Sequence, residues 1–305
     1  MPAMNTTSWM VKTSPGLSPK LLLCLAATWL VWGSTYLAIK VALVSLPPFF
    51  QMGSRFLVAG ALLAGWMRWR GVPWPGRRQW RNALVIGGLM LGGGMGGTAT
   101  AEQTVGSGLV VAFIAVMPLM IAGLNLLWGE RPTRLESLGI AFGLVGVLLL
   151  TQGQGFGASP AGLLAISVAC ASWAVGSVLS QRSLPLAPGA MGFASEMLAG
   201  GVVLMGLSLL GGETLPERIE PQALWAWAYL VVFGSLVAFN AYMVLLAEAS
   251  AGLASSYSFV NPVIAMLLGV TLAGEQISGH EWLAAGVVLV GVVLLLTGRG
   301  RSAAH

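Results

Sequence analysis

The sequence predicts an all-α integral membrane protein with ten transmembrane helices, arranged as two inverted five-helix repeats with both termini in the cytoplasm. Three observations support this fold class. Hydrophobic residues make up 56% of the chain and charged residues only 8%, whereas about 25% of residues are charged in ordinary soluble domains. The apolar residues fall into ten segments, each near the roughly 20 residues that cross a bilayer as a helix. Finally, one half of the chain recurs in the other.

The recurrence is clearest near the end of each half. Residues 126–150 read LLWGERPTRLESLGIAFGLVGVLLL, and residues 271–296 read TLAGEQISGHEWLAAGVVLVGVVLLL. Both runs hold a Gly-Glu pair followed six residues later by another glutamate, which apolar bias alone does not produce. Duplicated halves of this length are typical of transporters. We expect a first repeat over residues 20–152, a second over 160–298, and cytoplasmic tails at 1–19 and 299–305.

Each repeat supplies five of the expected spans. They run from Lys20 to Ala42, Phe49 to Trp69, Trp80 to Ala101, Val105 to Trp128, Arg134 to Thr151, Pro160 to Gln181, Pro188 to Gly211, Gln222 to Leu246, Gly252 to Ala273, and Glu281 to Gly298. The first segment follows a modestly basic stretch, as a signal peptide does, but its length and its repeat partner favour a span. Because five is an odd number, the second repeat enters the membrane from the opposite side.

Lysine and arginine set the orientation, because positively charged loops stay in the cytoplasm. With the N terminus inside, Arg218 is the only cation in an outer loop. The pI of about 9.7 therefore reflects membrane orientation. We expect a bacterial inner membrane location, contact with the lipid bilayer, and no nucleic-acid partner.

Helices one and six carry related polar and aromatic residues. Gly33-Ser34 in helix one corresponds to Gly176-Ser177 in helix six. Trp32 lies deeper than the tryptophans near span ends, which are typical interfacial anchors. We expect these two helices to contribute to an amphipathic central pocket for substrate, through Trp32, Thr35, Tyr36, Trp173 and Ser177.

Glycines crowd helix three, with Gly92, Gly93 and Gly96 at its centre. Glycines four residues apart let helix backbones approach closely, and each glycine also lowers intrinsic helix stability by about 1 kcal/mol relative to alanine. Two interpretations follow: a packing element alone, or a movable wall of the substrate path that takes part in gating.

Helices four and nine contain prolines at corresponding positions, Pro118 and Pro262. A proline inside a span removes a backbone donor and obstructs the preceding turn. We expect a kink in each helix, and paired interruptions in two halves are the best sequence indication of a central transport site. A kink without any ligand is the alternative.

Near Pro262, the side chains of Tyr257 and Asn261 lie four residues apart and share a helix face. Asn240 adds an amide in helix eight. Buried polar groups in a bilayer need partners, so these residues either bond between helices or line a wet cavity. We predict that Asn240, Tyr257 and Asn261 contact substrate.

Ionisable residues inside spans are costly and indicate function. Lys40, Arg55 and Glu196 lie within helices one, two and seven. Arg55 and Glu196 occupy corresponding positions, and snorkelling or pairing is expected to satisfy each of them. Glu102 and Glu248 lie nearer helix ends, where a solvated carboxylate costs little, and we expect structural or solvated carboxylates there.

Enzymatic chemistry finds no support in the sequence. The chain has no aspartate, only two histidines, and no HExxH, GxSxG or Walker pattern. Cys24 and Cys170 are single thiols in apolar segments and imply no disulfide or metal site. We expect no enzyme, cofactor or metal, and a gradient as the energy source, with the proton as a candidate coupling ion.

The chain resembles EamA-type members of the drug/metabolite transporter superfamily over nearly its full length. The resemblance rests on the ten-helix array, the Trp32-Gly33-Ser34-Thr35-Tyr36 run, Arg55-Phe56-Leu57, Pro118, and the Gly129-Glu130 and Gly274-Glu275 turns. It implies ten helices around a central cavity that opens alternately to either side. It also implies export of small metabolites or drugs, with amino acids and their derivatives among the substrates of relatives.

Two differences from other members of the superfamily narrow the range of expected mechanisms and substrates. Small multidrug-resistance relatives use a carboxylate in their first helix, whereas helix one here has no acid and carries Lys40. Nucleotide-sugar carriers of the superfamily would need a central cation for phosphate, and helix nine has none. We expect an exporter of small uncharged or zwitterionic amphiphiles; an uptake carrier or facilitator on the same scaffold, and a membrane scaffold without transport, are the alternatives.

Overall fold

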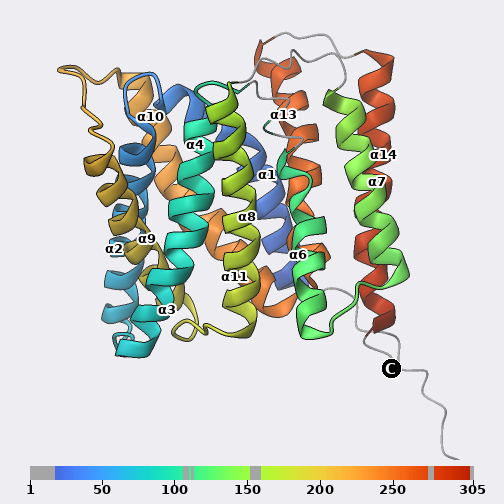
Figure 1. Cartoon of the computed structure of the whole chain (residues 1–305), viewed down its shortest axis with the longest axis horizontal. Coiled ribbons are helices and arrows are strands. Elements are labelled where there is room, and N and C mark those ends of the chain that lie inside the picture. Colours follow the sequence, from blue (N-terminus) through green and yellow to red (C-terminus); the bar gives the residue numbers. More distant parts are fainter. Residues whose placement is uncertain (1–17, 106–109, 111–112, 152–158, 274–277, 303–305) are drawn as a thin grey trace, which may run out of the picture.

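The computed structural model describes residues 18–105, 110, 113–151, 159–273 and 278–302, which form a bundle of helices without any strand (Figure 1). The elements are α1 (Pro19–Ala42), α2 (Pro48–Trp69), α3 (Arg77–Gly87), η1 (Gly88–Gly96), α4 (Gly97–Ala101), α6 (Met117–Asn125), η2 (Leu126–Trp128), α7 (Arg134–Thr151), α8 (Pro160–Arg182), α9 (Ala190–Leu210), α10 (Pro221–Tyr229), η3 (Leu230–Phe239), α11 (Asn240–Glu248), α12 (Ala251–Ala254), α13 (Tyr257–Ala273) and α14 (Gly279–Ser302). Most of the predicted N-terminal tail and the Gly274-Glu275 turn lie outside the described residues.

Helices one and six begin with the same local chemistry. Ser18 precedes Pro19, and its hydroxyl accepts a hydrogen bond from the Leu21 backbone N–H at 3.3 Å. Ser159 precedes Pro160 and accepts from the Gly162 N–H at 3.0 Å. A serine cap satisfies a free donor of the first turn, and proline suits that turn because its missing N–H is not needed.

Five helices are long and apolar enough to cross a membrane within the described part of the chain. They are Pro19–Ala42, Arg77–Ala101, Pro160–Arg182, Ala190–Leu210 and Pro221–Glu248. Large apolar side chains cover the outside of the bundle, as Leu23 and Leu209 do with 72% and 78% of their surface exposed. Such a surface suits lipid rather than water, so the predicted class of all-α membrane protein is confirmed.

Helices from the two halves of the chain pair along their lengths. The helix α2 packs against α9, and α7 packs against α14, with α7 and α14 antiparallel at one edge of the bundle (Figure 1). Gly139 and Gly291 make the second pair close: a Cβ atom added at Gly139 would lie 2.8 Å from the Gly291 carbonyl oxygen. Small residues permit this approach where no hydrophobic effect drives helix association.

The fourth and ninth predicted spans each contain a break in the helix, where only a kink was predicted. In the fourth predicted span, Ala115 and Val116 form a turn. The helix α6 then begins at Met117, with Pro118 in its first turn. In helix nine the break falls at residues 255–256, between α12 and α13, and Pro262 lies inside α13. Proline is compatible with a first turn but not with an unbroken preceding turn, which accounts for the break before Pro118.

Helices three and eight each contain a π-helical segment, which the sequence did not predict. The segment η1 spans Gly88–Gly96 and η3 spans Leu230–Phe239. The two lie at corresponding places in the two halves, at the offset of 143 residues that separates Gly33 from Gly176. π-Helical turns are rare and occur frequently at functional sites.

The two ends of the bundle differ in charge. One end, here called the basic end, holds the α2–α3 connection, the start of α7 and the last turn of α8, and in Figure 1 the C terminus lies at this end. Its arginines are Arg68, Arg70, Arg77, Arg78, Arg81, Arg131, Arg134 and Arg182. The opposite end holds the α1–α2 and α9–α10 connections, where Glu213, Glu217 and Glu220 lie.

Candidate functional site: a central aromatic cavity

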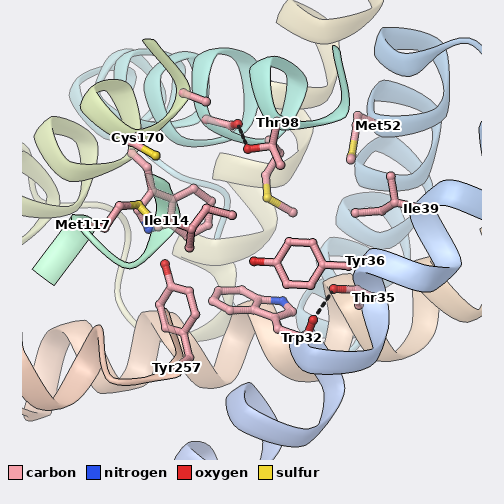
Figure 2. Close-up of a pocket in the computed structure, with 14 residues that line it drawn as sticks. Trp32, Thr35, Tyr36, Ile39, Met52, Thr98, Ile114, Met117, Cys170 and Tyr257 are labelled. Atoms are coloured by element: carbon pink, nitrogen blue, oxygen red, sulfur yellow. Dashed lines mark hydrogen bonds between the residues drawn. The ribbon is translucent and has the colours of Figure 1, made fainter. Parts of the chain in front are cut away.

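A small cavity lies at the centre of the bundle, between helices of both halves of the chain (Figure 2). Its open volume is about 50 Å³, which is room for a few water molecules at about 10–15 Å³ each. The side chains and glycines that line it belong to Trp32, Thr35, Tyr36, Ile39, Met52, Gly94, Met95, Thr98, Ile114, Met117, Ala169, Cys170, Trp173 and Tyr257. None of these residues is charged, so the cavity is apolar with a few hydroxyl groups.

Sequence reasoning named eight substrate-binding residues, and the structure brings part of that set together. Trp32, Thr35, Tyr36, Trp173 and Tyr257 line the cavity. Their contact with substrate stays a prediction.

Ser177, Asn240 and Asn261 do not line the cavity. Ser177 is fully buried behind it. The amide nitrogen of Asn240 donates to the Leu236 carbonyl of its own helix at 2.9 Å. With its amide nitrogen turned toward the backbone, Asn261 lies 3.2 Å from the Trp29 carbonyl and 3.1 Å from the Tyr257 carbonyl. These amides therefore bond within and between helices beside the cavity.

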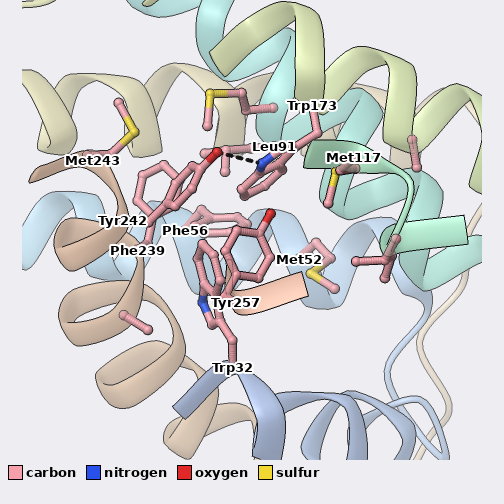
Figure 3. Close-up of a cluster of buried hydrophobic side chains, with 14 of the residues drawn as sticks. Trp32, Met52, Phe56, Leu91, Met117, Trp173, Phe239, Tyr242, Met243 and Tyr257 are labelled. Carbon is pink, nitrogen blue, oxygen red and sulfur yellow. Dashed lines mark hydrogen bonds between the residues drawn. The ribbon is translucent and has the colours of Figure 1, made fainter. Parts of the chain in front are cut away.

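Four aromatic rings pack against one another at the cavity wall (Figure 3). The Trp32 ring centre lies 5.7 Å from that of Trp173, 5.1 Å from that of Tyr242 and 4.7 Å from that of Tyr257. Tilted and edge-to-face arrangements at these distances are the favoured geometries of aromatic pairs. The cluster joins α1, α8, α11 and α13, so a movement of any one of these helices changes the cavity.

Tyr242 is a central member of this cluster that the sequence analysis did not single out. Its hydroxyl accepts a hydrogen bond from the Trp173 indole N–H at 3.0 Å and lies 2.9 Å from the Ser177 hydroxyl. Ser177 thus acts on the cavity through Tyr242 and Trp173. One feature of the sequence could have indicated Tyr242 as a site residue: it lies two residues after Asn240, in a span with few other polar side chains.

The π-helical segments contact the same cluster. The Trp32 indole N–H donates to the Gly234 carbonyl of η3 at 3.3 Å. In η1, a Cβ atom added at Gly94 would lie 2.9 Å from the Trp173 ring, and one added at Gly93 would lie 2.6 Å from the Ser172 hydroxyl oxygen. Gly92 and Gly96 likewise sit close to Val203 and Leu204 of α9. These glycines are therefore packing positions in this structure, and their part in gating stays a prediction.

The intramembrane ions were expected to be satisfied by pairing or snorkelling, and the structure shows otherwise for two of them. Arg55 is 1% exposed and Glu196 is fully buried, and neither forms an ion pair. Both Glu196 oxygens lack a hydrogen-bond partner among the described residues. Arg55 places its guanidinium carbon 4.5 Å from the centre of the Phe56 ring. Only Lys40 is exposed.

A structural or solvated carboxylate was expected at Glu102 and at Glu248, and the structure solvates only that of Glu248. Both Glu102 oxygens are buried and lack a hydrogen-bond partner in the described part of the chain. Glu248 has 46% of its side chain exposed and pairs with Lys20 at the basic end. The polypeptide continues past Glu102 as a turn to Val105.

A second, larger cavity of about 710 Å³ opens at the basic end. We call it the vestibule. It is lined by Ala122, Asn125, Glu130, Arg131, Pro132, Thr133, Glu136, Ile140, Ser180, Gln181, Arg182, Leu246, Ala247, Ala249, Ser250, Ala251 and Gly252. An ion pair between Arg182 and Glu130 and a hydrogen bond from the Gln181 amide to the Leu246 carbonyl lie at its wall.

At the opposite end, hydrogen bonds join the two halves of the chain. The Glu213 carboxylate accepts from the backbone N–H groups of Phe49 and Phe50 at 2.9 and 2.8 Å. It thereby caps α2, whose own N-cap residue, Pro47, has no side-chain hydrogen bond to offer. Nearby, the Ser45 hydroxyl accepts from the Glu220 backbone N–H at 3.1 Å.

No group of three or more metal-ligating side chains occurs in the described ranges. The free thiol of Cys170 lines the central cavity, and Cys24 is half-buried in α1.

These features define a class: a membrane protein of many spans, with a small central cavity, a wide vestibule at one end and hydrogen bonds between its two halves at the other. The EamA-like transporter family matches the chain over residues 19–152 and again over residues 160–297. The chain belongs to this family, whose members are transporters rather than enzymes.

Individual relatives agree with this assignment. The inner membrane transporter YedA of Escherichia coli (strain K12) is 43% identical over 276 residues, which cover 90% of each chain. Protein PecM of Dickeya dadantii is 28% identical over 270 residues, covering 88% of this chain and 86% of its own. The runs Asn240-Ala241-Tyr242-Met243 and Val260-Asn261-Pro262-Val263 predict similarity to YedA, and this prediction is confirmed. Like YedA, the chain is a multi-pass protein of the bacterial inner membrane.

The fold also has a counterpart in a solved crystal structure. That structure superposes with a TM-score of 0.74, at 23% identity, over 92% of this chain and 97% of its own. The likeness shows a common fold.

Proposed function

We propose that the protein is a secondary transporter that exports small amphiphilic metabolites or drugs across the inner membrane by alternating access. The observation that carries this proposal is the uncharged central cavity, lined by aromatic and hydroxyl side chains from both halves of the chain. Apolar pockets with a few placed polar groups are the usual form of small-molecule sites. The absence of charge among the described lining residues favours uncharged or zwitterionic amphiphiles, amino acids and their derivatives included.

Transport requires the cavity to widen, because its 50 Å³ cannot hold a metabolite. The elements that can move border the cavity or contact the aromatic cluster beside it. They are the break before Pro118, the break before α13, which holds Pro262, and the π-helical segments η1 and η3. In this account the structure is an occluded state in which the aromatic cluster fills the substrate position.

The pairing of the helices supports two inverted repeats. The pairs α2 with α9 and α7 with α14 join the second and the fifth helices of the two halves. The first helix of each half also contacts the π-helical segment of the other half. Thus α1 contacts η3, and α8 contacts η1. Rocking of two such repeats about a midplane site is a common transporter mechanism.

The arginines of the basic end support a cytoplasmic position for that end, by the positive-inside rule. Both termini are then cytoplasmic, and the vestibule faces the cytoplasm. This orientation suits an exporter, which collects its substrate from that side. Uptake or facilitated diffusion by a protein of the same fold is one alternative, and a membrane scaffold without transport is another. Each predicts a different pattern of flux.

A flux experiment separates these alternatives. Inside-out vesicles with and without the protein are given a panel of labelled amino acids and cationic drugs, in the presence and absence of a proton gradient. We expect accumulation that depends on both the protein and the gradient. Accumulation that only equilibrates would show a facilitator, uptake in right-side-out vesicles alone would show an importer, and no flux beside a stable co-purifying protein would support the scaffold.

The Asn261→Ala variant tests the predicted substrate contacts. We expect it to abolish transport at normal membrane abundance. Thr297→Ala, which removes a hydroxyl from the exposed surface of α14, serves as a control and keeps its transport. Loss of abundance in Asn261→Ala would instead show that its bonds to the Trp29 and Tyr257 carbonyls are structural.

A further inference from the structure

Three side chains on α2 and at the end of α4 hold buried polar atoms that lack a hydrogen-bond partner among the described residues. Gln51 is fully buried and lacks partners for both amide atoms, and Arg55 lacks them for Nε and one terminal nitrogen. Both carboxylate oxygens of Glu102 lack a partner as well. Buried polar groups are hydrogen-bonded in the large majority of cases, so each exception needs a physical reason.

Arg55 and Glu102 lie next to the central cavity. Arg55 follows the lining residue Met52 by three positions, and Glu102 follows the lining residue Thr98 by four. Residues three or four apart occupy the same face of a helix, and α2 packs against α4. Figure 2 shows Tyr36, Met52 and Thr98 on one side of the cavity.

Arginine and glutamate side chains carry opposite charges when ionised, and the packing of α2 against α4 brings the two groups to the same side of the cavity. They nevertheless form no direct ion pair, since the ion pairs of the described residues, with N and O within 4.0 Å, join other groups. Removing a charge from water costs several kcal/mol even after relaxation, and only close pairing and further hydrogen bonds offset that cost. A ligand placed between them and carrying both charges would supply those bonds.

We infer that Arg55 and Glu102 form a binding site for the head group of a zwitterion, with Arg55 holding the anionic group and Glu102 the ammonium group. The guanidinium fork suits a carboxylate, which it binds through two parallel hydrogen bonds. The aromatic and methionine side chains of the cavity then receive the apolar part of the ligand. This inference rests on the proposed function, because the ligand is the transported substrate.

A series of ligands that share one apolar tail tests the site. Phenylalanine carries both charges, phenylalaninamide only the cation, and 3-phenylpropionate only the anion. Binding to the purified full-length protein is measured in bilayer discs of phosphatidylglycerol, which contain no zwitterionic lipid. We expect phenylalanine to bind best. Arg55→Met should erase its preference over phenylalaninamide and Glu102→Gln its preference over 3-phenylpropionate, each a change of about 10- to 100-fold.

Matched variants control for folding. Arg68→Met removes an exposed arginine of the same helix, and Glu217→Gln an exposed glutamate at the opposite end, and both should keep the wild-type order of binding. Arg55→Lys keeps the charge and should restore part of the preference for the carboxylate. Loss of phenylalanine binding on addition of phosphatidylethanolamine would assign the same head-group site to a lipid.

The inference is overturned if the wild type binds the three compounds equally or binds none of them. It is also overturned if Arg55→Met weakens all three by the same factor, as a purely structural arginine would. The proposed function fails on a different result, namely absence of flux through the wild type for the whole labelled panel. Flux with unchanged head-group preference in both variants would leave the transporter standing and remove only this site.

Discussion

The two ends of the bundle are held together by different kinds of bonds. At the opposite end, the Glu213 carboxylate binds two backbone N–H groups of α2, and Ser45 binds the Glu220 N–H. At the basic end, exposed side chains form the ion pairs of Lys20 with Glu248 and of Arg182 with Glu130. The second end also holds the vestibule.

Bond chemistry explains this difference. A hydrogen bond to a charged group contributes about 1.5–3 kcal/mol to stability, whereas an exposed ion pair contributes about 0–1 kcal/mol. The opposite end therefore resists opening more strongly than the basic end. In the proposed export cycle, substrate would arrive at the basic end, and its release would require the Glu213 bonds to break.

Cysteine labelling measures how often each end opens. With Cys24 and Cys170 replaced by alanine, a single cysteine at Leu46, which is 3% exposed, reports on the opposite end. A single cysteine at Ser250, in the vestibule, reports on the basic end. We expect a water-soluble thiol reagent to modify the Ser250 position quickly and the Leu46 position slowly.

The largest change is expected from Glu213→Ala. This variant leaves the Phe49 and Phe50 N–H groups without their shared acceptor and removes a negative charge from the N terminus of α2. Labelling at the Leu46 position should rise about 10- to 100-fold, the equivalent of 1.5–3 kcal/mol. Glu217→Ala, an exposed change in the same connection, is the control, and an equal rise in that variant would refute the cap as the cause.

An intermediate change is expected from Ser45→Ala. The variant removes the acceptor of the Glu220 N–H but leaves the Glu213 cap in place. A neutral hydrogen bond contributes about 1 kcal/mol, so labelling at the Leu46 position should rise about fivefold. An increase as large as that of Glu213→Ala would show that the two connections open as one unit.

The smallest change is expected from Lys20→Met at the basic end. Its ion pair joins side chains that are 58% and 46% exposed, and such pairs contribute little because water screens them. Labelling at the Ser250 position should change by about twofold at most. A change of tenfold or more would mean that the basic end is also held by strong bonds, and the contrast between the ends would disappear.

Much of the fold follows from the sequence because its causes are local or periodic. Apolar segments of span length, prolines after serine caps and the recurrence of one half in the other all act over short distances. The π-helical form of η1 and η3 does not follow from such patterns, since it depends on which neighbouring helix each turn meets. The break before Pro118 was anticipated as a kink only, because a single proline fixes the position of a disruption but not its size.

The candidate site was predictable in part. Trp32, Tyr36 and Tyr257 stand out as aromatic residues deep in spans, and they line the cavity. Asn240 and Asn261 look the same in sequence, yet their amides bond to backbone carbonyls. An amide can bond to its own helix, to another helix or to a ligand, and the sequence does not distinguish these partners. The burial of Glu102 likewise depends on the path of the chain beyond α4.

The π-helical segments η1 and η3 also carry historical information. In a protein built from two fused copies of one gene, a feature at the same place in both copies was present before the fusion. A π-helical turn holds one residue more than an α-helical turn, so it records an old insertion. If the two halves arose by duplication, their common ancestor already carried this insertion in its third helix.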